Sequence, residues 1–238
     1  GKFTWMNLAK ITTPENLKAL GLALLLAFVS TVICLILAYP LAMILVGRNV
    51  NQSSFVVLVF ILPMWMNFLL RTLAWQTLLE KNGVINGILS FLHLPNIAII
   101  NTPWAIILGM VYNFLPFMIL PIYSVIIKLD RSLIEAARDL GANSFQVFRR
   151  VILPLSLPGV LSGITMVFVP SVSTFAISKM LGGGTEMLLG DLIEQQYMGG
   201  AYNPYLGAAI SLVMMVIVVI CMVVMNRFGE GEEQAVMM

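Results

Sequence analysis

Long uncharged stretches rich in Leu, Val, Ile, Ala and Met alternate with short polar segments along this chain of 238 residues. A helix that crosses a bilayer needs about 20 consecutive residues of this kind. The hydropathy pattern therefore predicts an all-α membrane protein with five spanning helices. We place them at residues 20–46, 53–79, 102–126, 157–177 and 205–226.

Proline and glycine positions add detail to three of these spans. Pro63 lies inside the second span, and Pro116 and Pro121 lie inside the third, so we expect both helices to be kinked. The fourth span opens with Gly159 and Gly163, and small residues at this spacing allow a neighbouring helix to approach closely.

The segments outside the spans divide the chain further. The first 18 residues mix polar and apolar positions, and Thr13 followed by Pro14 suits a helix cap and a first helical residue. The predicted organisation is an extracytoplasmic or interfacial segment at 1–18, a transmembrane domain at 19–226 containing a cytoplasmic loop at 128–157, and a cytoplasmic tail at 227–238.

Composition supports the membrane assignment and excludes several functions. Hydrophobic residues make up 60% of the chain and charged residues 10%, whereas soluble domains have about 25% charged residues. The net charge of +2 gives no reason to expect a nucleic-acid partner. Two cysteines inside apolar runs and a single histidine favour neither a disulfide nor a metal site.

Enzymatic chemistry has no obvious basis in this sequence either. No constellation of a nucleophile with a general base is apparent, so we assign no catalytic residues. A glycine-rich phosphate loop ending in Lys and Ser or Thr is also missing, and we therefore expect no ATP binding by that route. Any energy for transport has to come from a partner protein.

Basic residues are concentrated between the third and fourth spans. Lys and Arg are enriched in cytoplasmic loops of membrane proteins, so this clustering predicts that the loop faces the cytoplasm. Five of the 13 basic residues lie there: Lys128, Arg131, Arg138, Arg149 and Arg150.

The same loop has the pattern of two short helices separated by a glycine. Ser132 and Glu135 have the spacing of a capping box, and Gly141 stands where the first helix would stop. Asn143 and Ser144 can cap a second helix that continues through Arg149. We expect Pro154 and Pro158 to end this second helix before the next span.

The first of these helices carries a narrow apolar stripe bordered by charges of both signs. The stripe comprises Leu133, Ala136, Ala137 and Leu140. Small side chains allow close approach, so the helix could dock in a groove of another protein. An amphipathic helix lying on the membrane surface would have a similar pattern. The residues alone leave both interpretations open.

The loop resembles the EAA motif of permease subunits in binding-protein-dependent ABC importers. The matching residues are Glu135, Ala136, Ala137, Gly141, Leu153 and Pro154, and Val151 stands where the family most often has Ile. The resemblance implies that this segment forms coupling helices that seat in a cleft of a cytoplasmic ATPase subunit. It also implies the helical-bundle fold of type I ABC importer permeases.

The resemblance extends over residues 20–224 and is closest to permeases of bacterial spermidine/putrescine importers. It is carried by residues 63–71, residues 115–123 and the Lys128-Leu129-Asp130 sequence that leads into the EAA motif. The family has six spans, so five spans imply that its first helix is absent from this chain. The implied location is the bacterial inner membrane. The implied partners are a homologous permease, an ATPase dimer that binds ATP and Mg²⁺, and an extracytoplasmic polyamine-binding protein.

Candidate substrate-contact residues follow from the chemistry of a polycation, which favours carboxylates, aromatic faces and amide oxygens. Asp191 and Glu194 are three residues apart and would share one helix face with Tyr197 nearby, although a solvated helix would have the same pattern. Four candidates within the spans could equally be interfacial anchors or helix–helix contacts. These four are Trp65, Asn67, Tyr112 and Asn113.

Arg71 is a charged residue inside the second span. A buried cation is costly in a membrane, so we expect it to extend towards the interface or to pair with an acid such as Glu80 or one on a partner subunit.

Two classes of function remain open at the sequence level. The favoured class is a polyamine importer permease, with sulfate, molybdate or ferric iron as alternative substrates of the same kind of importer. The other is a membrane scaffold whose loop binds a cytoplasmic partner. The full EAA spacing favours the importer, because a scaffold has no reason to retain it.

Overall fold

The computed structural model describes residues 13–47, 50–199 and 202–236, and all the regular elements within these ranges are helices. The chain divides into two compact units. Unit 1 comprises residues 1–31, 64–113 and 168–220, and unit 2 comprises residues 32–63, 114–167 and 221–238.

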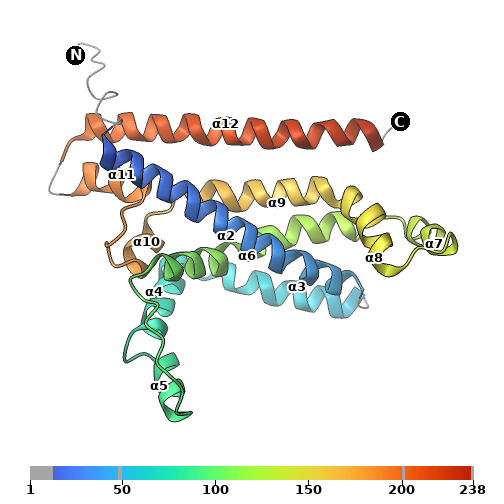
Figure 1. Cartoon of the computed structure of the whole chain (residues 1–238), viewed down its shortest axis with the longest axis horizontal. Coiled ribbons are helices and arrows are strands. Elements are labelled where there is room, and N and C mark those ends of the chain that lie inside the picture. Colours follow the sequence, from blue (N-terminus) through green and yellow to red (C-terminus); the bar gives the residue numbers. More distant parts are fainter. Residues whose placement is uncertain (1–12, 48–49, 200–201, 237–238) are drawn as a thin grey trace. The chain divides into compact units, whose positions relative to one another are not determined.

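Four helical segments of the described chain are long and apolar enough to cross a membrane (Figure 1). They are α2 (Pro14–Val46), α6 (Pro103–Ile126), the helical run Ser144–Ser173, and Pro204–Met225 within α12 (Pro204–Val236). The first, third and fifth predicted spans are thereby confirmed. Pro14 is indeed the first residue of α2, and the N–H of Leu17 donates to the Thr13 carbonyl at 3.1 Å.

The second predicted span is two helices rather than one kinked helix. Helix α3 (Val50–Trp65) ends two residues beyond Pro63, and a second helix, α4 (Phe68–Leu79), follows. The stretch Phe68–Phe91 is bent by 98° against Leu58–Trp65. Asn67 has a non-helical backbone and is the N-cap of α4, since its side-chain Oδ1 accepts from the N–H of Leu69 at 2.8 Å. The expected kink of one continuous helix is therefore wrong: the span is broken, about one helical turn after Pro63.

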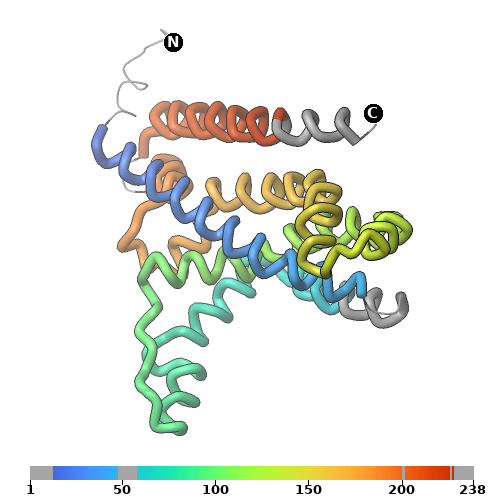
Figure 2. Tube along the Cα trace, turned by 45° about the vertical axis from the view of Figure 1, so that its right-hand side comes forward, coloured from blue at the N-terminus to red at the C-terminus, as the bar shows by residue number. Residues whose placement is uncertain are grey.

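Unit 1 also contains three shorter helices, α5 (Val84–Phe91), α10 (Ala176–Leu181) and α11 (Leu189–Met198). Figure 2 shows the chain running out along α4 and α5 and returning in an extended segment to α6. Buried Asn86 holds this excursion together. Its amide donates to the carbonyls of Glu80 and Ile97 and its Oδ1 accepts from the N–H of Ile97, all within 3.1 Å.

The fourth span ends earlier than predicted. Helix α9 (Leu153–Ser173) stops at Ser173, and Ile177 belongs to the separate helix α10, where it is fully buried. Gly190 approaches the carbonyls of Ser173 and Thr174 at this point, since a Cβ at Gly190 would lie within 2.9 Å of both oxygens. The break between α9 and α10 coincides with this tertiary contact, which local hydropathy does not predict.

Unit 2 holds the predicted loop as α7 (Arg131–Asp139), α8 (Ser144–Val147) and a π-helical turn, η2 (Phe148–Ile152), which continues into α9. Pro154 and Pro158 do not end the helix, contrary to the prediction. Pro154 occupies the first turn of α9, where the preceding π-type bond from the Leu153 N–H to the Phe148 carbonyl already changes the register.

Candidate coupling loop and substrate-contact residues

Helix α7 begins at a different cap from the one predicted. Asp130 is the N-cap, and its Oδ1 accepts from the N–H of Ser132 at 2.9 Å, so the expected Ser132–Glu135 capping box is wrong. This hydrogen bond to the Ser132 backbone lowers the pKa of the Asp130 carboxyl from its ordinary value. Asp is a strong N-cap, and it moves the start of the helix two residues upstream.

Gly141 ends α7 as predicted, in a complete Schellman motif. Its φ is +85°, and its N–H donates to the Arg138 carbonyl at 2.8 Å. The N–H of Ala142 donates to the Ala137 carbonyl at 3.1 Å, which gives the two bonds of the motif. A left-handed residue is required at this position, which explains why the chain has a glycine there.

The second short helix is capped by Asn143, again as predicted, and Gln146 completes the cap. The N–H of Gln146 donates to Asn143 Oδ1, and the N–H of Asn143 donates to Gln146 Oε1, both at 2.9 Å. The Asn-x-x-Gln spacing signals this reciprocal arrangement, and the sequence reasoning overlooked it.

Several apolar residues of the loop are exposed, whereas Val147 and Ile152 are buried. No residue of α7 is buried, and the exposed fractions are 89% for Leu140, 67% for Phe145 and 47% for Leu133. Glu135 lies at a cavity of about 560 Å³ between the loop and the ends of α2 and α6. Among the remaining motif residues, Ala136 and Pro154 are exposed, whereas Ala137 and Leu153 are half-buried. The loop thus presents an apolar surface that the described part of the chain leaves uncovered.

Asp191 and Glu194 lie together on α11, as predicted, but each is already engaged. Glu194 accepts from Lys179 Nζ at 2.7 and 3.0 Å. Asp191 Oδ2 accepts from the N–H of Leu188 at 2.9 Å. Both acids line a cavity of about 230 Å³ to which Glu186 also contributes.

The electrostatics of these two acids differ. Burial raises the pKa of the Asp191 carboxyl, and nearby Glu194 raises it further, whereas the hydrogen bond from the Leu188 N–H, the neighbouring Ser178 side chain and the charge of Lys179 lower it. Glu194 carries its charge beside an ammonium group. Asp191 is therefore the better candidate of the two for meeting an added cation.

Tyr197 and the four candidates within the spans do not converge on this cavity. Tyr197 is 42% exposed and packs against Gly207. The remaining four have other surroundings. Trp65 is 78% exposed, and Asn67 caps α4. The ring of Tyr112 meets that of Trp75 edge-on. Buried Asn113 donates to the Gly109 carbonyl of its own helix. None of these five side chains lines this cavity, and their part in a substrate pathway stays a prediction.

Arg71 is 7% exposed, so the protein itself covers this side chain, and its extension towards the membrane interface or pairing with a partner's acid stays a prediction. Its Nε has no hydrogen-bond partner, and the one ion pair found among the described residues joins Lys179 to Glu194 instead.

Sequence reasoning also missed a larger cavity in unit 1, of about 780 Å³. It lies between the first turns of α2, the segment after α10, and α11. Its polar lining includes Glu15, Lys18, Glu186 and Gln195. Residues so far apart in the chain carry no joint signal in a single sequence.

Comparisons with known proteins identify relatives of the whole chain. A family model described as "Binding-protein-dependent transport system inner membrane component" matches residues 24–230. The spermidine/putrescine transport system permease protein PotB of Haemophilus influenzae is 37% identical over 227 residues, which cover 94% of this chain and 79% of that protein. The Escherichia coli protein of the same name is 36% identical over 227 residues, covering 94% and 82%.

The solved structures give a matching fold at lower sequence identity. A bacterial alginate ABC transporter in complex with an alginate pentasaccharide-bound periplasmic protein superposes with a TM-score of 0.79 at 17% identity, over 95% of this chain and 82% of that one. At this identity the likeness shows the fold alone.

Proposed function

The chain belongs to the family of inner membrane components of binding-protein-dependent transport systems, and from that premise we propose that it is the permease subunit of an ATP-driven importer of polyamines. As a member of this family it is a multi-pass inner-membrane protein and a transporter subunit. Polyamines such as spermidine and putrescine are the proposed substrates.

One observation carries the choice of substrate. The relatives that match at 36–37% identity over 94% of this chain are spermidine/putrescine permeases. The chemistry of α11 supports the same choice, because Asp191, Glu194 and Glu186 place three carboxylates beside one lysine at a single cavity. An importer of sulfate or molybdate would be expected to present basic residues there.

The proposed assembly contains this chain, a homologous permease, an extracytoplasmic polyamine-binding protein and a separate ATPase that holds ATP and Mg²⁺. The EAA segment from Glu135 to Gly141 is proposed to contact the ATPase. The exposed apolar side chains of Leu140 and Phe145 support this proposal, since an apolar patch on a cytoplasmic loop favours a protein contact.

The mechanism follows from this arrangement. The loaded binding protein delivers polyamine to the outer mouth between the two permeases, and Asp191 offsets part of the cost of stripping water from an ammonium group. ATP-driven closure of the ATPase dimer displaces the coupling loops and reverses the side on which the pathway opens.

The proposal is tested by the ATPase activity of the whole complex in lipid nanodiscs. We expect binding protein loaded with spermidine or putrescine to stimulate hydrolysis, and unloaded binding protein with added sulfate to leave it at the basal rate. If a binding protein loaded with sulfate or iron stimulates ATP hydrolysis and the polyamine-loaded one does not, the chain is still an importer permease but polyamine is not its substrate. Failure of the chain to copurify with any ATPase would favour the scaffold alternative.

A further inference from the structure

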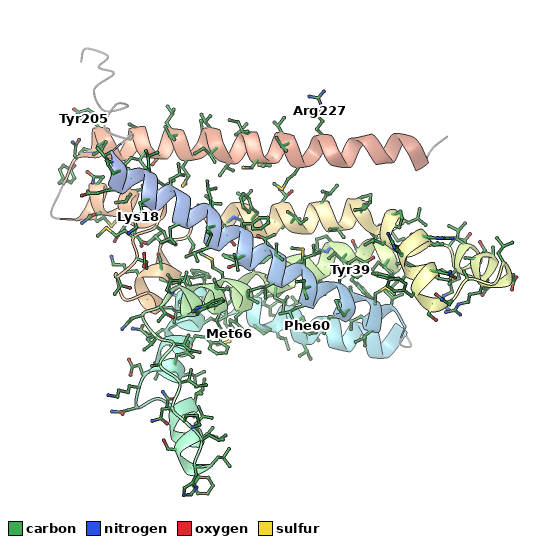
Figure 3. The ribbon with its side chains drawn as sticks, viewed as in Figure 1. Lys18, Tyr39, Phe60, Met66, Tyr205 and Arg227 are labelled. Atoms are coloured by element: carbon green, nitrogen blue, oxygen red, sulfur yellow. The ribbon has the colours of Figure 1, made fainter. Side chains whose placement is uncertain are left out.

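Tyr39 contacts both ends of the π-helical turn that joins the coupling loop to α9. Tyr39 lies on the part of α2 that belongs to unit 2 (Figure 3). Its ring meets that of Phe148 edge-on, with centroids 5.5 Å apart and planes at 88°. Its hydroxyl lies 2.6 Å from Ser156 Oγ. Phe148 is the first residue of η2 and Ser156 lies in the first turn of α9, so one side chain spans the turn.

The direction of the hydrogen bond follows from the number of protons available. Ser156 has one hydroxyl proton, and its Oγ donates it to the Leu153 carbonyl at 3.0 Å. The Tyr39 hydroxyl is therefore the donor to Ser156. Tyr39 is 8% exposed and Ser156 is fully buried, so water does not replace this bond when it is broken.

The turn between these two contacts is a natural point of flexure. In η2 the Leu153 N–H bonds five residues back, to Phe148, and Pro154 has no N–H to continue the ladder. π-Helical turns of this kind occur frequently at functional sites. Without a contact across it, the turn would let the coupling loop rotate without moving α9.

Helix α9 is in turn tightly seated on α6 within unit 2. A Cβ at Gly159 would lie 2.9 Å from the Pro121 carbonyl, and one at Gly163 would lie 2.7 Å from Met118 Sδ. Interfaces this close resist sliding, because a small shift produces a steric clash. The flexible joint in unit 2 is therefore the π-helical turn rather than the α6–α9 contact.

We propose that Tyr39, Phe148 and Ser156 form a clamp that makes α2 and α9 follow the coupling loop when the ATPase displaces it. Tyr39 is thus a positioning residue for transport, and it touches neither ATP nor substrate. This inference rests on the proposed function, because the ATPase contact belongs to it. Its consequence is that breaking the clamp uncouples ATP hydrolysis from transport without unfolding the chain.

The first test measures the number of spermidine molecules imported per ATP hydrolysed by the reconstituted complex. Tyr39→Phe keeps the ring contact with Phe148 and removes the hydrogen bond. We expect import per ATP to fall about five-fold, the effect of one net buried hydrogen bond on a conformational equilibrium. Ser156→Ala should have a similar effect, and the double variant should lose no more than either single variant.

Ser124→Ala is the matched control, since the Ser124 hydroxyl donates only to the Pro121 carbonyl of its own helix. It should leave import per ATP unchanged. Wild-type coupling in both Tyr39→Phe and Ser156→Ala would overturn the clamp. Equal losses of coupling in Ser124→Ala would also overturn it, because the effect would then belong to any hydroxyl in unit 2.

A second measurement separates failure of the clamp from failure of the proposed function. Spin labels at exposed Leu37 of α2 and exposed Ser132 at the start of α7 lie in unit 2 and outside the proposed ATPase contact. Pulsed electron resonance reports their separation, with Cys221→Ala in the background and buried Cys34 retained. The clamp predicts one distance distribution with and without ATP in the wild-type complex and an ATP-dependent change in Tyr39→Phe. An ATP-dependent change already present in the wild type would overturn the clamp, whatever the substrate is.

Discussion

At the scale of single residues, backbone geometry and burial decide the roles that residue type only suggests. Gly141 was predictable from the sequence because a helix that stops in an exposed loop favours glycine after its last turn. The Asp191–Glu194 pair was predictable as neighbours on one helix face. The Lys179–Glu194 ion pair was not predictable, because it joins α10 and α11 across a connecting segment whose path the sequence does not specify.

Gly141→Ala should weaken the coupling loop through backbone strain alone. A Cβ there meets no atom within 4 Å, but the φ of +85° costs a non-glycine residue about 1–2 kcal/mol. We expect less ATPase to copurify with the variant, with the thermal unfolding of the spans unchanged. Gly87→Ala is the control, since it adds a Cβ in equally open space within a regular helix. Equal ATPase recovery in the two variants would argue against a role for the Schellman turn.

Asp191 should give the pH profile of polyamine uptake an acid limb, a fall in uptake at low pH. Its raised pKa means that it takes up a proton at a higher pH than an ordinary carboxyl does, and protonation removes the negative charge that attracts a cation. Polyamine uptake should therefore fall as the pH drops through the raised pKa, and Asp191→Asn should be low and lack this limb. Glu80→Gln, at an exposed acid in the same unit, should keep the wild-type pH profile. An unchanged pH profile in Asp191→Asn would show that Asp191 only accepts the hydrogen bond from the Leu188 N–H and does not attract the substrate.

At the scale of elements, hydropathy predicted which helices exist and failed where a side chain or a tertiary contact ends one. The spans at α2, α6 and α12 were predictable because a bilayer imposes a length and an absence of charge. The break at Asn67 was missed because Pro63 is the stronger local breaker, whereas the cap made by Asn67 sets the actual boundary. The end of α9 at Ser173 depends on Gly190, which is distant in sequence.

Asn67→Ala should destabilise α4 by about 1 kcal/mol, the usual effect of removing an N-cap. Asn67→Ser retains an oxygen that can accept from the same N–H groups and should restore most of the loss. Thermal unfolding of the purified chain in detergent measures both effects. Identical melting of the alanine and serine variants would show that the cap does not contribute to the break.

Leu140→Ser should weaken ATPase binding about ten-fold, because burying a largely exposed leucine against a partner contributes about 1.5–3 kcal/mol. The fold should be unaffected, since this side chain is 89% exposed in the chain itself. Phe91→Ser on α5 is the comparison, as Phe91 is 83% exposed but lies outside the coupling loop. Titration of the ATPase against the two permeases in nanodiscs, prepared without ATPase, gives the affinity. Similar losses in both variants would point to general disruption rather than docking.

At the scale of the whole molecule, the class of protein follows from the sequence more completely than the site does. An apolar, nearly uncharged composition and the EAA spacing indicate an importer permease, and the family match over residues 24–230 confirms it. The cavities in unit 1 are assembled from residues between 13 and 206, so they depend on packing that no local pattern reports. In the proposed assembly a second permease completes the substrate pathway, and its residues are not in this sequence.

Uptake of labelled spermidine by proteoliposomes tests the central claim most directly. The vesicles contain the whole complex with ATP on the ATPase side and the binding protein on the other, and unlabelled putrescine, sulfate and ferric iron serve as competitors. The account predicts saturable, ATP-dependent uptake that putrescine inhibits and that sulfate and ferric iron leave unchanged. ATP-dependent import of sulfate or iron, with spermidine remaining outside, would contradict it.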